Sequence, residues 1–150
     1  MSEPVSALMG RSNRVAAPAP AATHLIGIED TGLTGQITLR GDLGSIEIRT
    51  ALEQVMRCDV PAPLAHSDGK AVWMSPDELL LLVPHGEAAA RVRALSDALA
   101  GVHHMALDVS DARSRLRLTG ALVGEVLAGG TVTLGGADGE AVRGQVLMDS

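Results

Sequence analysis

The apolar positions along the chain follow strand and helix periods in turn. Gln36–Arg40 alternates polar and apolar residues, which is typical of a half-buried strand. After the break Gly-Asp-Leu-Gly, apolar residues recur at helical spacing over 45–57, with Asp42 or Ser45 available as the N-terminal cap. The pattern predicts a strand and then a helix, with these apolar positions facing a core: Ile37, Leu39, Ile48, Leu52, Val55 and Met56.

Two further strands are predicted in the middle of the chain. Prolines at 61 and 63 favour an extended connection, and Ala71–Met74 then forms a short apolar strand. Ser75–Glu78 has the composition of a turn. The next segment, Leu79–Val83, is apolar without alternation, as a strand buried on both faces would be. We expect it at the centre of the sheet.

A second helix and a fourth strand follow. Glu87–Ala100 has one apolar face, and Gly101 supplies a stop. Glu87 and Arg91 are placed for an i,i+4 ion pair on its outer side. His103–Val109 then alternates as a strand. The apolar face of the predicted helix consists of Ala88, Val92, Leu95 and Leu99. The apolar face of the predicted strand consists of Met105, Leu107 and Val109.

The order of elements up to residue 109 is βαββαβ, which is the ferredoxin-like arrangement and places the first and third strands centrally. Arg113–Thr119 predicts a fifth strand, in which Arg115 and Arg117 alternate with leucines, and Ala121–Ala128 predicts a short helix. The glycine-rich remainder has no regular pattern. The fold class is therefore α+β, a ferredoxin-like unit followed by an incomplete second βα unit. We expect the fifth strand to be an open sheet edge, which favours association.

Length and composition set the domain organisation. The 150 residues, 46% hydrophobic and 20% charged, suit one globular domain, in which Trp73 is the single aromatic residue. We expect a flexible N-terminal arm at 1–30, Ala/Pro-rich near its middle, and one domain at 31–150. Within that domain, 36–109 is the ferredoxin-like unit and 110–150 the partial second unit.

The net charge and the cysteine content indicate which kinds of partner and which cellular compartment to expect. The net charge of −6 argues against nucleic acid, and no apolar run reaches the ~18 residues that a membrane span needs. The arm lacks the leucine-rich centre of a signal peptide. Cys58, the single cysteine, suits a reducing compartment, so a cytoplasmic protein is expected. A catalytic thiol is the sharper interpretation of Cys58, but a small hydrophobe or a bystander without a role is the favoured one.

The search for chemistry yields no site. The five histidines have no metal-ligand spacing, and two of them are adjacent on a strand and point to opposite faces. Asp108–Asp111 could be assembled into an acid/base pair, yet turn chemistry is the favoured interpretation. Glycines at 120–130 match no nucleotide-binding motif. We expect no catalytic, cofactor-binding or metal site. The histidines are His24, His66, His85, His103 and His104.

Three phrases, in order along the chain, carry a family resemblance. They are ITLRGDLG at 37–44, WMSPDELLLL at 73–82 and HH-x-A-x-x-VSDAR at 103–113. With MSEPVSAL at 1–8, they resemble the gamma subunit of heterotetrameric sarcosine oxidase. The resemblance covers roughly residues 1–128. The chain then departs from the family's pattern, so we expect a shortened C-terminus, either natural or from a change of frame.

The resemblance implies a fold akin to the folate-binding aminomethyltransferase (glycine cleavage T-protein) domain. It implies an assembly that oxidises sarcosine to glycine with tetrahydrofolate and oxygen. In it the alpha and beta subunits hold FAD, FMN, NAD and folate, a delta subunit holds zinc, and the gamma chain binds none of them. We expect a non-catalytic gamma subunit with alpha, beta and delta partners. The alternatives are a stand-alone folate-binding or aminomethyltransferase-like protein, or a truncated non-functional remnant. Trp73 and the edge near Arg115 and Arg117 are interface candidates.

Overall fold

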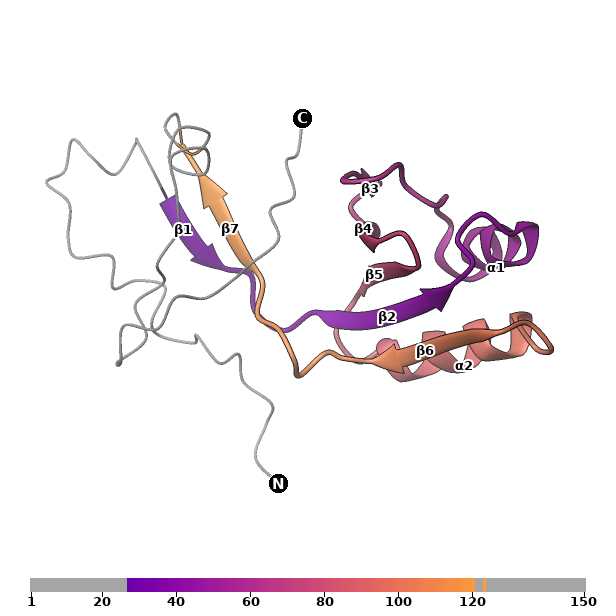
Figure 1. Cartoon of the computed structure of the whole chain (residues 1–150). Coiled ribbons are helices and arrows are strands. Elements are labelled where there is room, and N and C mark those ends of the chain that lie inside the picture. The colour runs from indigo at the N-terminus through magenta and orange to yellow at the C-terminus, as the bar shows by residue number, and fades with distance from the viewer. Residues whose placement is uncertain (1–26, 121–122, 124–150) are drawn as a thin grey trace, which may run out of the picture. The chain divides into compact units, whose positions relative to one another are not determined.

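A computed structural model of the chain describes residues 27–120 and residue 123, which divide into two compact units (Figure 1). The larger unit is Leu33–Arg113, and the smaller one joins residues 27–32 to 114–120. The larger unit contains β2 (Gly35–Gly41), α1 (Ile46–Met56), β3 (His66–Ser67), β4 (Ala71–Ser75), β5 (Glu78–Val83), α2 (Ala88–Ala98) and β6 (His104–Asp108).

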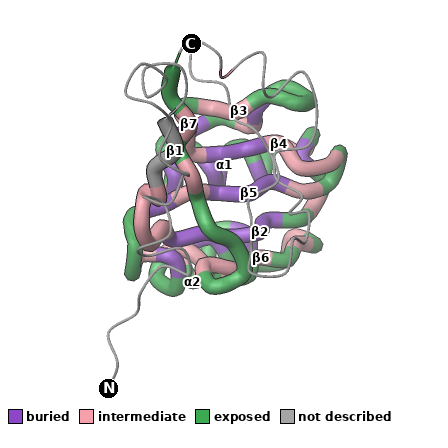
Figure 2. The backbone as a smooth tube through the Cα atoms, turned by 90° about the vertical axis from the view of Figure 1, so that its left-hand side faces the viewer, coloured by how far each residue is buried: buried purple, intermediate pink, exposed green. Residues whose placement is uncertain are grey.

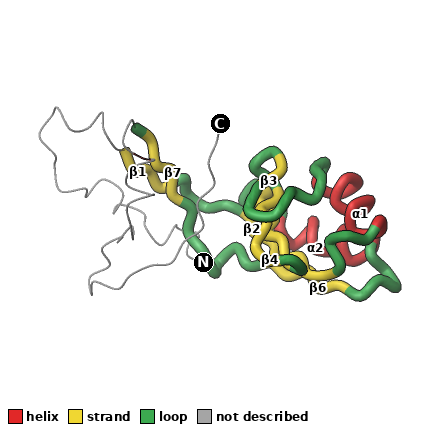
Figure 3. Tube along the Cα trace, turned by 45° about the horizontal axis from the view of Figure 1, so that its top comes forward, coloured by secondary structure: helices red, strands yellow, loops and turns green. Residues whose placement is uncertain are grey.

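The sheet of the larger unit has the predicted ferredoxin-like topology. Its order is β3-β4-β5-β2-β6, and every neighbouring pair is antiparallel. The first and third strands of the βαββαβ unit, β2 and β5, are central, as the sequence predicted. Figure 3 shows both helices on one side of this sheet.

The core lies between the two central strands and the two helices. Ile37 and Leu39 of β2 and Leu79 and Leu81 of β5 are completely buried, and Figure 2 shows both strands largely in the colour of buried residues. Each such side chain contributes about 1.5–3 kcal/mol when it leaves water. The helices contribute the apolar faces that the sequence predicted, with these members buried: Ile48, Leu52, Met56, Ala88, Leu95 and Leu99.

The ends of α1 are closed by groups near and far in sequence. Of the two predicted caps, Ser45 occupies the N-cap, and its hydroxyl accepts a hydrogen bond from the Ile48 amide at 3.3 Å. At the other end, Arg57 takes the left-handed conformation, with φ 55°. The ammonium of Lys70 donates to the Arg57 carbonyl oxygen at 3.1 Å. A cation from β3–β4 therefore complements the negative end of the helix.

The β3–β4 hairpin was not predicted, although the sequence carries its signal. Asp68 and Gly69 have φ of 50° and 63°, and the Lys70 amide donates to the Ser67 carbonyl oxygen at 2.8 Å. Two positive φ angles define a type I′ turn, for which Asp-Gly is a favoured pair. The short strand β3 escapes the periodicity test because it has only two residues.

β6 lies at the edge of the sheet, and this position changes the role of its apolar residues. Ala106 pairs with Leu39 and faces the helices, where it packs against the core. The predicted apolar face, which includes Met105 and Leu107, is the opposite one. These two side chains remain 39% and 50% exposed.

The smaller unit corrects one prediction. The fifth strand, β7 (Leu116–Thr119), was expected to be open, but it pairs antiparallel with β1 (Gly27–Asp30), with Ile28 opposite Leu118. The backbone amide and hydroxyl of Thr31 both donate to the Arg115 carbonyl oxygen, at 3.2 and 3.1 Å. The prediction was wrong because the partner strand, β1, lies within the segment that was expected to be a flexible arm. β1 is also too short to show an alternation of polar and apolar residues.

The remaining predictions for the chain ends lie mostly outside the described residues. Of the predicted helix at 121–128 the structure describes only Val123, and the glycine-rich residues from 129 onward are not described. Both α1 and α2 have 11 residues. Within residues 27–120, no helix has the length and hydropathy needed to cross a membrane.

Candidate functional site

Two of the three characteristic phrases meet at one end of the central strands. Arg40, at the end of β2, lies 3.6 Å from the carboxylate of Asp77 and 3.4 Å from that of Glu78. The Gly41 amide donates to the Asp77 carbonyl oxygen at 3.0 Å. The hydroxyl of Ser75 donates to the Asp77 carboxylate at 2.6 Å. This hydrogen bond, and then the charge of Arg40, lowers the pKa of the Asp77 carboxyl. The charged residues of both phrases thus fix the β4–β5 turn against β2.

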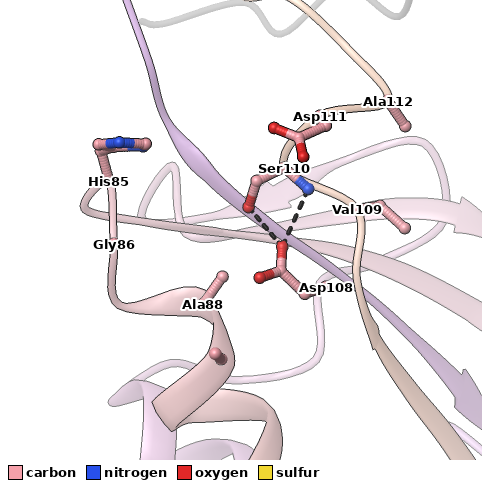
Figure 4. Close-up of a pocket in the computed structure, with 9 residues that line it drawn as sticks. His85, Gly86, Ala88, Asp108, Val109, Ser110, Asp111 and Ala112 are labelled. Carbon is pink, nitrogen blue, oxygen red and sulfur yellow. Dashed lines mark hydrogen bonds between the residues drawn. The ribbon is translucent and has the colours of Figure 1, made fainter. Parts of the chain in front are cut away.

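The third phrase forms a turn that ties the end of β6 to the start of β2. Asp108 accepts hydrogen bonds from the Ser110 amide at 3.0 Å and from the Ser110 hydroxyl at 2.5 Å (Figure 4). The same hydroxyl oxygen accepts from the Gln36 amide at 3.0 Å. The Gln36 side-chain amide donates to the Arg113 carbonyl oxygen at 3.1 Å. Turn chemistry at Asp108–Asp111, the interpretation favoured from the sequence, is confirmed.

This turn forms one wall of an open depression. The other wall comes from the β5–α2 connection and the first turn of α2, where His85, Gly86 and Ala88 lie across from residues 108–112 (Figure 4). Ala89 also lines the depression. His85 and Asp111 are both exposed to solvent. The Asp108 carboxylate is occupied by Ser110. An acid/base pair needs a proton acceptor that is positioned within reach of a substrate. The Asp108 carboxylate instead accepts hydrogen bonds that stabilise the turn.

Of the four described histidines, His103 and His104 are adjacent in the chain, whereas His66 and His85 belong to other segments. His66 begins β3, and its Nδ1 accepts from the Gly69 amide at 3.3 Å. His104 begins β6, and its Nδ1 lies 2.8 Å from the Val102 carbonyl oxygen, whereas His103 precedes the strand. Within 27–120, no three His, Cys, Asp or Glu side chains are placed to hold one metal ion. His24 lies outside the described residues.

Cys58 packs as a small hydrophobe, which was the favoured interpretation. Its side chain belongs to the core cluster and is only 3% exposed. Burial raises the pKa of the Cys58 thiol to about 11, and the nearby ammonium of Lys70 offsets only part of this effect. At neutral pH the group is a thiol, not the thiolate that nucleophilic catalysis requires.

The predicted interface candidates differ in exposure. Trp73 is half-buried in β4, and Arg115 and Arg117 are exposed. The sequence predicted an open sheet edge at the strand that contains these arginines. This prediction was wrong for one edge of that strand, because β7 pairs with β1 there. Sequence reasoning overlooked the turn at 62–65, which has exposed apolar side chains, follows Pro61 and contains Pro63. The signal was present in the uncharged run Pro61–Ala65.

The fold and the hydrogen-bonding roles of these residues define the structural class of the described chain. It is an α+β protein with a ferredoxin-like unit in which the polar side chains of the characteristic phrases brace the fold. The chain belongs to the sarcosine oxidase gamma subunit family: the family described as "Sarcosine oxidase, gamma subunit family" matches residues 40–135. No curated protein matches the chain.

A solved structure supports the fold. The chain is similar to a chain of "Heterotetrameric Sarcosine Oxidase from Corynebacterium sp. U-96 in complex with pyrrole 2-carboxylate", with 24% sequence identity and a TM-score of 0.67. The match covers 83% of this chain and 63% of that one. The ferredoxin-like prediction and the family resemblance agree with this fold.

Proposed function

We propose that this chain is a non-catalytic gamma subunit of a heterotetrameric sarcosine oxidase, which oxidises sarcosine to glycine with tetrahydrofolate and oxygen. The observation that carries the proposal is the family match over residues 40–135, which includes all three characteristic phrases in part or whole. Its partners are the alpha, beta and delta subunits, and the site of action is the cytoplasm.

The ion pairs and hydrogen bonds made by the polar residues of the three phrases support a structural role for this chain. Arg40 pairs with Asp77 and Glu78, and Ser110 bridges Asp108 to Gln36. Groups engaged in this way hold strands in register and are not free to bind a cofactor or move a proton. We therefore propose that this chain carries no catalytic, cofactor-binding or metal site. FAD, FMN, NAD, tetrahydrofolate and zinc belong to the partner subunits.

The domain organisation is also proposed on this basis. Residues 36–109 form the ferredoxin-like unit and residues 110–150 belong to a partial second unit, after the segment 1–30. The larger described unit, Leu33–Arg113, has boundaries close to the first of these.

Co-expression tests the proposal. Cognate alpha, beta and delta chains are produced with and without this chain, and the complex is assessed by size-exclusion chromatography with light scattering. Flavin content and sarcosine-dependent release of hydrogen peroxide are measured on the same fractions. The expected result is a heterotetramer containing this chain, with less assembled oxidase when it is omitted. A flavin-loaded, active complex that forms equally well without it would contradict the proposal.

A ligand titration separates the assembly role from a folate-binding one. The isolated chain is titrated with tetrahydrofolate by isothermal calorimetry, and the intact tetramer is titrated in parallel. Heat should be released by the tetramer alone. Saturable binding to the isolated chain would favour a stand-alone folate-binding protein instead.

A further inference from the structure

Among the described strands, β6 forms the longer of the two edges of the five-stranded sheet. The strand at the other edge, β3, has two residues, whereas β6 has five. Figure 2 shows β6 as the last strand of the sheet, next to β2. Natural edge strands are commonly protected from pairing with another chain by short length, lysine, proline or a bulge. β6 contains neither lysine nor proline, and its register with β2 is continuous.

The hydrogen-bonding phase of β6 determines which of its backbone groups face outward. The Val109 amide donates to the Gln36 carbonyl oxygen at 2.8 Å. Because alternate residues of an antiparallel pair exchange hydrogen bonds, Met105 and Leu107 also direct their backbone groups toward β2. The backbone groups of three other residues therefore point away from the sheet, where no described strand pairs with them. These residues are His104, Ala106 and Asp108.

This free edge also has exposed apolar side chains. Met105 and Leu107 are 39% and 50% exposed, on the face of the sheet opposite the helices. They are two of the four large apolar residues that are exposed in the described part of the chain, and both lie on this one short strand. An unpaired backbone with apolar side chains beside it is the form of edge that pairs with another strand.

The sequence of β6 is complementary to itself in the antiparallel direction. When Ala106 lies opposite Ala106 of a second copy, Met105 faces Leu107 of the copy. The hydrogen-bonding phase fits this register, because Ala106 and its counterpart then exchange their outward N–H and C=O groups. Met105 and Leu107 form the pairs between the hydrogen-bonded ones, in which opposite side chains approach most closely.

The same register also places complementary polar groups opposite each other. His104 lies opposite Asp108 of the second copy, so an imidazole that can carry a positive charge faces a carboxylate. The bonds from Ser110 to the Asp108 carboxylate both end on Oδ1. The other oxygen, Oδ2, can therefore accept a hydrogen bond from the copy. Every position of β6 thus has a suitable partner in a second β6.

We propose that this chain pairs with a second copy of itself through β6, so that the two sheets become one continuous antiparallel sheet. The twofold axis passes between the two Ala106 residues. Such a contact uses the same edge on both copies and is closed, so its product is a dimer. Pairing would cover Met105 and Leu107, whose exposure the single chain leaves unexplained. The pairing is a property of the free chain and does not rest on the proposed function.

Hydrogen exchange of the isolated full-length chain at several concentrations tests the pairing and its register together. Sedimentation equilibrium should show a monomer and a dimer, with a dissociation constant on the order of 10 µM because the interface is small. Well above this concentration, the outward amides of His104, Ala106 and Asp108 should exchange roughly 10-fold more slowly than in the monomer. The amides of Met105 and Leu107 should change little, because they already donate to β2.

Met105→Glu and Leu107→Lys test the register through charge. Each variant alone places a charge opposite an apolar side chain and should weaken dimerisation at least roughly 10-fold. In a 1:1 mixture of M105E and L107K, the new carboxylate faces the new ammonium at one pair, and the other pair keeps its methionine and leucine. The mixture should therefore form heterodimers with nearly the wild-type affinity.

Leu64→Lys is the matched control for Leu107→Lys. It makes the same change at a leucine of the same unit that is 86% exposed and lies outside β6. Dimerisation of L64K should equal that of the wild type, and circular dichroism checks that each variant is folded. The hydrogen-exchange measurement needs no variant, so it decides the question even where a variant does not fold.

Several results would overturn the proposal. These are a wild-type chain that stays monomeric at about 1 mM, dimers that persist in both single variants, and a mixture that forms no heterodimer. Oligomers larger than a dimer would contradict a closed twofold contact. Equal weakening by L64K would show a non-specific association of exposed apolar residues. Assembly with alpha, beta and delta chains is measured separately, so its failure would refute the proposed function and leave the pairing through β6 intact.

Discussion

The guanidinium of Arg91 in α2 donates a hydrogen bond to the carbonyl oxygen of Val55 in α1 at 2.5 Å. The same side chain is paired with Glu87, one helical turn before it, at 3.1 Å. The i,i+4 pair was predicted from the sequence, whereas the bond to α1 was not. Since α1 has no basic residue in its last turn, Arg91 supplies a positive charge to that end of the helix from a neighbouring element.

Arg91→Ala removes both interactions, so the free energy of unfolding should fall by about 1–2 kcal/mol, because the arginine is partly exposed and its ion pair is weakened by solvent. Urea denaturation followed by circular dichroism measures the change. Arg93→Ala, at an exposed arginine of the same helix, is the control and should change stability by less than about 0.5 kcal/mol. Equal effects would show that the bond to Val55 adds nothing.

Gly41 lies where β2 passes against α1 and the segment before β6. A Cβ atom at this position would stand 2.5 Å from Ile48 Cδ1 and 3.3 Å from the His103 carbonyl oxygen. Because Ile48 is completely buried, Gly41→Ala should destabilise the chain by about 1–3 kcal/mol through overpacking.

Ile48→Val removes the Cδ1 atom that the new methyl group would meet, so it should relieve part of the cost of Gly41→Ala. The double variant should be more stable than the sum of the two single changes predicts, by about 0.5 kcal/mol or more. Additive losses would place the conflict at the His103 carbonyl oxygen.

Ser110→Ala tests the turn after β6. The change leaves the Gln36 amide, in a buried residue, without its acceptor and Asp108 without one donor. The expected loss is about 1–3 kcal/mol of unfolding free energy. Hydrogen exchange of the Gln36 amide should also accelerate. Asp111→Ala, in the same turn, provides the comparison, and a similar loss there would argue against the specific role of the hydroxyl.

Cys58 predicts a pH dependence of stability. Burial raises the pKa of its thiol from 9.0 to about 11, so the folded chain holds this proton at pH values where the unfolded chain releases it. The resulting stability is fully present below about pH 9 and is lost as the pH rises from 9 to 11, on the order of 2 kcal/mol in total. Denaturation of the wild type and of Cys58→Ala across this range isolates the contribution. Parallel curves would contradict it.

The thiol should also react slowly in the folded protein. Labelling with a disulfide reagent at pH 8 is expected to follow unfolding, because the side chain is 3% exposed and protonated. Addition of urea should accelerate it, and rapid labelling of the native chain would show that the site is accessible.

The periodicity of the sequence determined most of the larger unit. Ile37 and Leu39 share a face because strand side chains alternate, and Leu79–Val83 is central because a strand buried on both faces is apolar at every position. The helix faces of α1 and α2 follow from a 3.6-residue period. The three phrases also determined the family, and their polar residues were correctly interpreted at Asp108 as turn chemistry.

Tertiary structure decided what depends on contacts between distant segments. The pairing of β1 with β7 joins residues about ninety positions apart, and a four-residue strand gives too short a pattern to predict its partner. The exposure of Met105 and Leu107 follows from the edge position of β6, which alternation alone cannot specify. The left-handed backbone of Leu64 arises because the turn is held at both ends, by buried Pro61 and by the bond from Trp73. Local sequence sets which residues can be buried, and only the packing of the whole unit determines which of them are.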